Sequence, residues 1–265
     1  MKYEEAVASF EFGKGENYVI LIHGYSGNPY EMRDLGQYLA DYGFHTIAPC
    51  LPGHGQNKEA LLKTGWRDWW AEVKRNIDTV KEKNPLNLFI SGLSVGGTLT
   101  LYAAARYPSI TAISPICAPV YTKKSYRWGF KFVKPFMTFI PSKHYPHRDV
   151  YDQNLLKDPV FQENRRRYDK EVAPAFESVL KLFDEVKNHS LSKITVPAVI
   201  SQARNDRTVV PSNGSYIFNH ITTKIEEKKL VWLERSGHIA TVDCDKKVLF
   251  REISNFFKKF LKKKD

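Results

Sequence analysis

The clearest chemical signal in the chain is the pentapeptide GLSVG at residues 92–96, which has a serine at its centre. An apolar run at Leu88–Ser91 precedes it and a helical pattern follows. At such a strand-to-helix turn only small residues fit around the serine, and the turn lifts its hydroxyl above the sheet edge. The helix dipole and free N–H groups there favour developing negative charge. The context favours a nucleophilic Ser94 over an incidental glycine turn.

A serine hydroxyl needs a base, and the base needs a group that orients it. His238 follows a short apolar run, Leu230–Leu233, and precedes the last helical pattern, which is a position from which an imidazole can reach back to Ser94. Asp206 follows another apolar run, Pro197–Gln202, and can accept the Nδ1–H of His238. We therefore predict Ser94, Asp206 and His238 as the catalytic residues.

Other acids compete with Asp206 for this role. Asp243 and Asp245 lie just beyond His238, near the start of the last helix, where capping of the helix N-terminus explains them better. Asp184 and Glu185 lie in a helical stretch farther from these motifs and are weaker candidates.

The tetrahedral intermediate of acyl transfer needs two backbone N–H donors. We expect one from Val95, the residue after the nucleophile, and one from Tyr25 in the loop after the first apolar strand. The histidine that opens this loop, His23, is interpreted as buried and hydrogen-bonded rather than catalytic. His54 is interpreted in the same way, as a residue that fixes a turn.

Short apolar runs and longer helical patterns alternate along the chain, and they must position these residues. The expected strands are 18–22, 46–48, 86–91, 110–117, 197–202 and 230–233, and the expected helices are 29–42, 66–83, 95–107 and 245 to the C-terminus. Val248, Leu249 and Ile253 are among the residues expected to face inward on the last helix. Such alternation predicts an α/β fold, with a mostly parallel central sheet flanked by helices.

The alternation fails between residues 119 and 190, where helical pieces occur without a convincing strand. We interpret this stretch as an inserted helical cap or lid over the sheet's C-terminal edge, and residues 1–118 and 191–265 as the core. An acyl pocket or ordinary packing inside the cap would explain its apolar side chains equally well. The candidates for the pocket are Trp128, Phe132, Phe136, Met137, Phe139 and Ile140.

The net charge of +11 first suggests a nucleic acid or an anionic surface as partner. Residues 119–190 hold fourteen Lys and Arg against nine Asp and Glu, and residues 251–265 hold six against two, so most of the excess is local. No nucleic-acid module is recognisable, which favours solvated faces and leaves weak attraction to anionic membranes or micelles open. The N-terminus resembles no signal peptide, so we expect a cytoplasmic protein.

The three cysteines are far apart, without metal-ligand spacing, and are expected to be buried free thiols. The histidines form no metal-binding pattern either, so neither a metal nor a cofactor is implied.

Six stretches together resemble the bacterial carboxylesterase and monoacylglycerol lipase group of the α/β-hydrolase superfamily. They are LIHGYSGNP, PCLPGHG, WRDWW, GLSVGG, NDRTVVP and SGHIATVD, and they span the whole core in order. The resemblance implies the α/β-hydrolase fold and hydrolysis of short or medium acyl esters, or of monoacylglycerols, through a covalent acyl-enzyme. It implies the same catalytic residues and oxyanion donors as above. Many members have Met or Leu where this chain has Val95, a change that a backbone donor tolerates.

The same catalytic residues would also serve an aryl (feruloyl-type) esterase, a thioesterase, an acyltransferase or a perhydrolase. A non-catalytic binding protein on a hydrolase scaffold is an alternative of another class. The acyl-chain preference and the oligomeric state are not determined by the sequence.

Overall fold

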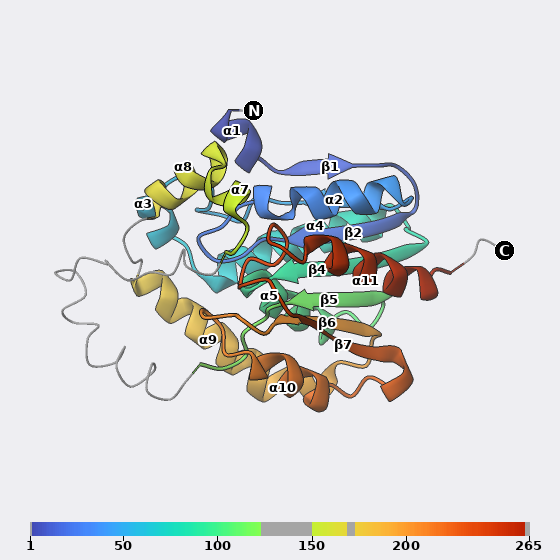
Figure 1. Cartoon of the computed structure of the whole chain (residues 1–265). Helices are drawn as coiled ribbons and strands as arrows, with labels where there is room; N and C mark the ends of the chain where they lie inside the picture. Colours follow the sequence, from blue (N-terminus) through green and yellow to red (C-terminus); the bar gives the residue numbers. More distant parts are fainter. Residues whose placement is uncertain (1, 123–149, 169–172, 263–265) are drawn as a thin grey trace.

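The computed structural model describes residues 2–122, 150–168 and 173–262. Its central sheet has seven strands in the order β1-β3-β2-β4-β5-β6-β7 (Figure 1). All neighbouring strands are parallel except β1 and β3, which pair antiparallel. The strands are β1 (Phe10–Phe12), β2 (Asn17–Ile22), β3 (His45–Ala48), β4 (Asn87–Leu93), β5 (Ala112–Ile116), β6 (Ala198–Ala203) and β7 (Lys228–Leu233). This confirms the predicted mostly parallel α/β sheet, to which β1 adds an edge strand that we did not predict.

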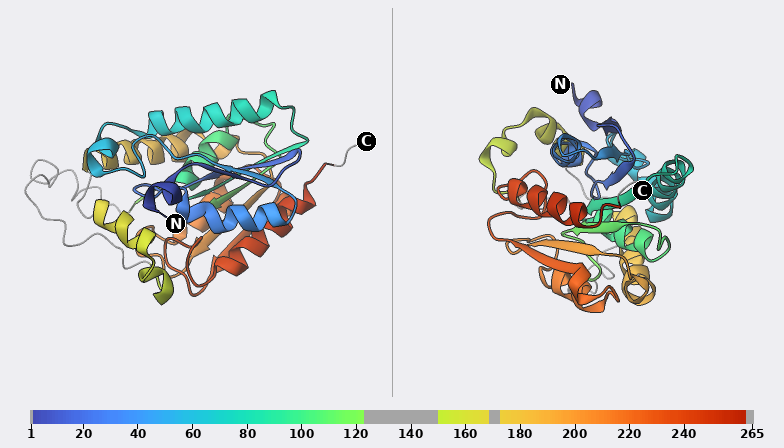
Figure 2. Two further views of the ribbon diagram at one scale, coloured as in Figure 1. Left: turned by 90° about the horizontal axis from the view of Figure 1, so that it is seen from above. Right: turned by 90° about the vertical axis from the view of Figure 1, so that its right-hand side faces the viewer.

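Helices cover both faces of the sheet (Figure 2). The described helices are α1 (Tyr3–Val7), α2 (Tyr30–Asp41), α3 (Lys58–Leu62), α4 (Trp66–Glu82), α5 (Val95–Ala104), α7 (Gln153–Leu156), α8 (Pro159–Arg167), α9 (Ala173–His189), α10 (Ser212–His220) and α11 (Lys246–Lys259), with short 3₁₀ turns at Leu191–Lys193 and Ile225–Glu227. Because alternate residues of a strand point to opposite faces, β2 contributes to two cores. Ile20 packs with α4, α5 and α9, whereas Val19 and Leu21 pack with α2 and α11.

The amphipathic patterns place most apolar residues as expected. Met32, Leu35 and Leu39 of α2 are fully buried, and so are Leu249 and Ile253 of α11. The expectation for Val248 is wrong. Its side chain lies on the outer side of α11 and is 39% exposed. Only one side of the helix faces the sheet, so a residue next to Leu249 in the sequence can still point to solvent.

The described part of residues 119–190 contains α7, α8 and α9 and no strand. The buried side chains of α9, among them Val179, Leu182 and Val186, belong to the same apolar cluster as those of α4 and α5. The division of the chain into core and cap stays a prediction.

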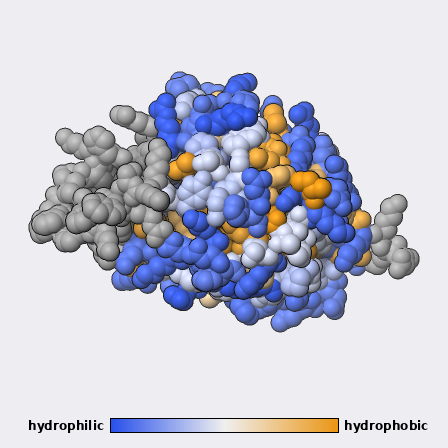
Figure 3. All heavy atoms as spheres, turned by 90° about the horizontal axis from the view of Figure 1, so that it is seen from below, coloured by the Kyte–Doolittle hydropathy of each residue, from blue (hydrophilic) through white to orange (hydrophobic). Residues whose placement is uncertain are grey.

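The described surface exposes only a few large apolar side chains, and they come from separate elements. They are Tyr42, Leu62, Ile225 and Val248. One face of the molecule shows apolar atoms between hydrophilic ones (Figure 3). Scattered exposure of this kind is usual for folded proteins and needs no partner to explain it. Among the described residues, no helix has the length and apolar character that crossing a membrane requires.

Candidate active site

The turn between β4 and α5 holds Ser94 in a backbone conformation with φ +55° and ψ −121°. A non-glycine residue is rare at such an angle and is typical of strained functional positions. The turn is tight on every side. A Cβ atom at Gly92 would lie 2.3 Å from the carbonyl oxygen of Gly96, and one at Gly96 would lie 2.2 Å from that of Ile22. The two glycines are therefore required for the main chain to pass through this turn.

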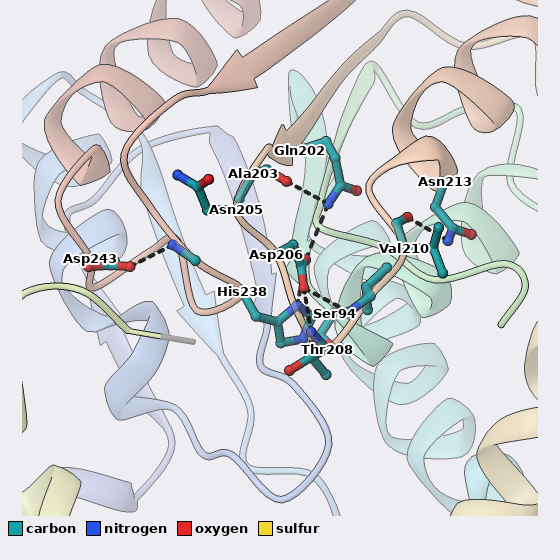
Figure 4. Close-up of polar contacts among 12 residues, drawn as sticks. Ser94, Gln202, Ala203, Asn205, Asp206, Thr208, Val210, Asn213, His238 and Asp243 are labelled. Atoms are coloured by element: carbon teal, nitrogen blue, oxygen red, sulfur yellow. Dashed lines mark hydrogen bonds and ion pairs between the residues drawn. The ribbon is translucent and has the colours of Figure 1, made fainter. Parts of the chain in front are cut away.

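Three side chains form a hydrogen-bonded series across the carboxyl ends of the strands (Figure 4). Ser94 Oγ lies 2.8 Å from His238 Nε2, and His238 Nδ1 lies 2.8 Å from Asp206 Oδ2. The Asp206 side chain is fully buried, and that of His238 is 9% exposed. A proton on Nδ1 satisfies Asp206 and leaves Nε2 free to accept the serine proton. The structure thus brings together the three predicted catalytic residues, which lie in the turns and loops that follow β4, β6 and β7.

The carboxylate of Asp206 is fixed from two sides. Its Oδ1 accepts the backbone N–H groups of Thr208, at 3.0 Å, and Val209, at 2.7 Å. Its Oδ2 accepts the side-chain amide of Gln202, at 3.2 Å, in addition to His238. Because these donors hold the carboxylate in one orientation, the imidazole can adopt only one productive tautomer.

Asp243 and Asp245 fix the loop that carries His238. Asp243 accepts four backbone N–H groups, those of Tyr151, Asp152, Gly237 and Cys244. Asp245 accepts those of Arg235 and Ser236.

The expectation that these acids cap the last helix is wrong. Asp245 does occupy the position before α11, but its side chain makes no capping bond. Its carboxylate is instead occupied by the N–H groups of Arg235 and Ser236 in the loop before His238.

The loop after β2 lies directly against the nucleophile. A Cβ atom at Gly24 would lie 3.3 Å from the Cβ of Ser94. Tyr25, the expected oxyanion donor, follows immediately, and Val95 opens α5. The Tyr25 ring packs near the rings of Trp69, at 5.9 Å, and Phe176, at 6.3 Å. The backbone at both expected donors is thus next to Ser94.

The two histidines interpreted as structural are buried and make backbone hydrogen bonds. His23 Nδ1 donates to the carbonyl of Gly24 at 2.9 Å, while Nε2 accepts the N–H of Leu51 at 3.0 Å. Burial lowers the pKa of His23 to about 4, so it is neutral near pH 7. His54 Nδ1 donates to the carbonyl of Pro52 at 3.2 Å, and burial holds its pKa well below the usual range. These contacts confirm the interpretation.

One acidic residue beside the site was missed in the sequence. Glu31, in the first turn of α2, is only 7% exposed and contacts the loop that leads to Tyr25. The sequence does indicate that Glu31 faces inward, because it lies one helical turn before the buried Leu35 on the same side of α2. Burial raises the pKa of Glu31 to about 7, and the Gly24 N–H and His238 lower it in part.

Cys117 lies close to the same residues. One ligand-type atom each of Cys117, Asp206 and His238 lies within 4.8 Å of the others. Three such groups are a minimal metal-binding set, but Asp206 and His238 already satisfy each other here, which fits the serine chemistry better. The expectation of buried thiols holds for Cys117 and is wrong for Cys50 and Cys244, which are partly exposed at loop positions.

The predicted pocket residues lie outside the described part of the chain. They are Trp128, Phe132, Phe136, Met137, Phe139 and Ile140.

Comparisons with known proteins agree with this geometry. The family model described as serine aminopeptidase, S33, matches residues 13–245. A carboxylesterase of Bacillus subtilis strain 168 is 28% identical over 94% of this chain and 96% of its own length. A thermostable monoacylglycerol lipase of Bacillus sp. strain H-257 is 32% identical over 91% of this chain and 90% of its own. A solved structure described under the metagenome-derived lipolytic enzymes LipS and LipT superposes with a TM-score of 0.80. It is 26% identical and covers 96% of this chain and 98% of its own.

Proposed function

This chain belongs to the serine aminopeptidase S33 family of α/β-hydrolases, in the group of carboxylesterases and monoacylglycerol lipases, and we propose that it hydrolyses carboxylic esters. The substrates we propose are short or medium acyl esters or monoacylglycerols. The observation that carries the proposal is the hydrogen-bonded series from Ser94 through His238 to Asp206. A hydroxyl in line with an oriented imidazole is an activated nucleophile for an acyl group.

In the first half-reaction, Ser94 Oγ attacks the ester carbonyl carbon while His238 Nε2 takes its proton. The carbonyl oxygen becomes an oxyanion that accepts the N–H groups of Tyr25 and Val95. Asp206 stabilises the imidazolium through the Nδ1–H bond, without taking the proton. When the carbon–oxygen bond of the ester breaks, His238 returns the proton to the leaving alcohol. The acyl group is then bonded to Ser94.

The second half-reaction repeats these steps with water. His238 removes a proton from water as its oxygen attacks the acyl carbon, and the oxyanion again forms at the same donors. Collapse releases the carboxylic acid and returns the proton to Ser94 Oγ. Losing one oxyanion donor should lower kcat by roughly 10²–10³-fold.

Hydrolysis of p-nitrophenyl butyrate and of a monoacylglycerol tests the proposal. We expect turnover by the unaltered protein, near-complete loss in Ser94→Ala, and unchanged turnover in the control Ser109→Ala, which alters an exposed loop serine. Labelling by a fluorophosphonate probe should likewise disappear only in Ser94→Ala. Unaltered turnover by Ser94→Ala would refute the assignment. Absence of both labelling and turnover in the unaltered protein would favour a non-catalytic binding protein.

The other reactions of the same residues differ in the acyl donor and acceptor. Aryl esters, acyl-CoA thioesters and added alcohol acceptors would identify an aryl esterase, a thioesterase or an acyltransferase. No observation favours any of them over ester hydrolysis.

The cap at residues 119–190 and its six apolar side chains are proposed to select the acyl group. Basic residues of the cap and of the C-terminal helix are proposed to give weak contact with anionic membranes or micelles, which co-sedimentation with anionic vesicles would test.

A further inference from the structure

Glu31 is a buried acid whose carboxylate is packed against main chain. A Cβ atom placed on Gly27 would lie 2.2 Å from Glu31 Oε2, 2.6 Å from Cδ and 2.7 Å from Oε1. The carboxylate therefore lies against the Cα of Gly27, in the space that any other residue's side chain would fill. Burying a carboxylate is unfavourable unless hydrogen bonds or charges compensate it, so its position needs a reason.

The reason lies in the loop between Glu31 and the nucleophile. The Gly24 N–H donates a hydrogen bond to the Glu31 carboxylate. A Cβ atom on Gly24 would lie 3.7 Å from Glu31 Oε2 and 3.3 Å from the Cβ of Ser94. Gly24 is thus held between the carboxylate and the serine, and the next residue along the chain is Tyr25.

His238 also acts on this carboxylate electrostatically. Its positive form favours the ionised form of Glu31, an effect smaller than that of the Gly24 N–H. The charged residues next to Glu31 on α2 interact with other side chains. The Arg33 guanidinium lies over the rings of Phe10 and Phe12 of β1, and Asp34 pairs with Lys246 of α11.

We propose that Glu31 is a positioning residue for acyl transfer, one that fixes the oxyanion loop through the Gly24 N–H and favours the protonated form of His238. The proposal rests on the proposed function, because both effects concern the tetrahedral intermediate. The intermediate pairs an oxyanion at the loop with an imidazolium at His238. A fixed loop places the Tyr25 donor before the reaction begins, and a nearby negative charge stabilises the imidazolium.

The charge is tested with Glu31→Gln, whose amide oxygen can still accept the Gly24 N–H. Charge coupling is reciprocal, so removing the negative charge should lower the pKa of His238 over the pH range in which Glu31 is ionised in the unaltered protein. The acid limb of kcat/KM against pH should therefore move to lower pH. The control is Asp34→Asn, which removes a charge from the same helix at an exposed position and should leave the limb in place.

The loop contact is tested with Glu31→Ala, which removes the acceptor as well. We expect kcat to fall by about 10- to 100-fold with KM little changed, because the oxyanion exists only beyond the ground state. This loss is smaller than that for a missing donor, since the Tyr25 N–H is displaced rather than absent. Gly27→Ala should have a similar effect by pushing the carboxylate aside, and adding it to Glu31→Ala should bring little further loss. Full additivity of the two losses would overturn the loop contact.

The outcomes separate this proposal from the proposed function. An NMR titration of the His238 ring in the unaltered protein and in Glu31→Gln needs no turnover. Fluorophosphonate labelling of Ser94 together with identical His238 pKa values in the two proteins would overturn the effect of Glu31 on His238 and leave the serine chemistry intact. Failure of labelling and turnover in the unaltered protein would refute the serine chemistry itself, and the catalytic role of Glu31 with it.

Discussion

Replacing Glu31 by glutamine removes a charge that the folded protein holds away from water. Burial raises the pKa of this carboxyl from 4.5 to about 7, so the folded state binds the proton more tightly than the unfolded chain. The stability that Glu31 contributes is therefore complete below pH 4.5. It is lost progressively as the pH rises through about 7. Glutamine has no such titration, so the difference in stability between the two proteins must change with pH.

The size of this change follows from the two pKa values. Between pH 4.5 and about 7, each pH unit alters the free energy of unfolding by about 1.4 kcal/mol. The total change reaches about 3 kcal/mol above pH 7. We therefore expect Glu31→Gln to gain stability relative to the unaltered protein as pH rises. The gain should be small at pH 5 and about 3 kcal/mol at pH 8.

Urea unfolding of both proteins at pH 5, 6, 7 and 8 measures this difference, since the titrations of all other groups largely cancel. Asp34→Asn is the matched control, because this carboxylate is exposed and its removal should give a small, nearly constant difference. A difference between Glu31→Gln and the unaltered protein that is constant from pH 5 to pH 8 would refute the reasoning. It would mean that Glu31 is ionised in the folded protein as easily as in the unfolded chain.

Three further predictions concern the rest of the site. Asp206→Asn should lower kcat by roughly 10³–10⁴-fold, because the imidazole loses its orienting acceptor, as measured by steady-state hydrolysis of p-nitrophenyl butyrate. Asp243→Asn should destabilise the fold by about 2–4 kcal/mol, because it weakens bonds to four backbone N–H groups. Urea unfolding measures this, and an unchanged midpoint would contradict it. Gly96→Ala should prevent correct folding, because its Cβ would lie 2.2 Å from the Ile22 carbonyl oxygen, and the yield of folded protein by circular dichroism checks this.

The sheet and the nucleophile turn could be predicted because their signals are local. Continuous apolar runs mark strands that are buried on both faces, and the glycines around Ser94 mark a turn that no larger residue could make. The strand Phe10–Phe12 gave no such signal. It is a three-residue edge strand whose middle residue, Glu11, faces solvent, and its partner in the sheet is β3, which lies more than 30 residues farther along the chain. Pairing between distant segments is not visible in a short window of sequence.

The roles of the acids depend on long-range contacts, which explains the errors made there. From sequence spacing, Asp243 and Asp245 lie where helix caps usually lie. In the structure they accept N–H groups from the His238 loop and from residues 151–152, more than 90 positions away. Glu31 could not be assigned for the same reason. Its spacing shows that it faces inward, but not that the Gly27 main chain and the Gly24 N–H meet it there.

The buried acid and the strained serine have opposite effects on folding and on the proposed reaction. Ser94 keeps φ +55°, which is unfavourable for a serine, and Glu31 keeps a carboxylate out of water. Neither arrangement is explained by packing, since glycine at position 94 and glutamine at position 31 would relieve each one. Both are explained if the site is organised for the tetrahedral intermediate, in which the serine oxygen is bonded to carbon and His238 carries a positive charge. The Glu31→Gln variant, which should gain stability at high pH, should therefore also have the acid limb of its kcat/KM profile at lower pH. Measuring urea unfolding and the pH profile of kcat/KM on the same Glu31→Gln protein tests whether the gain in stability and the shift of the acid limb occur together.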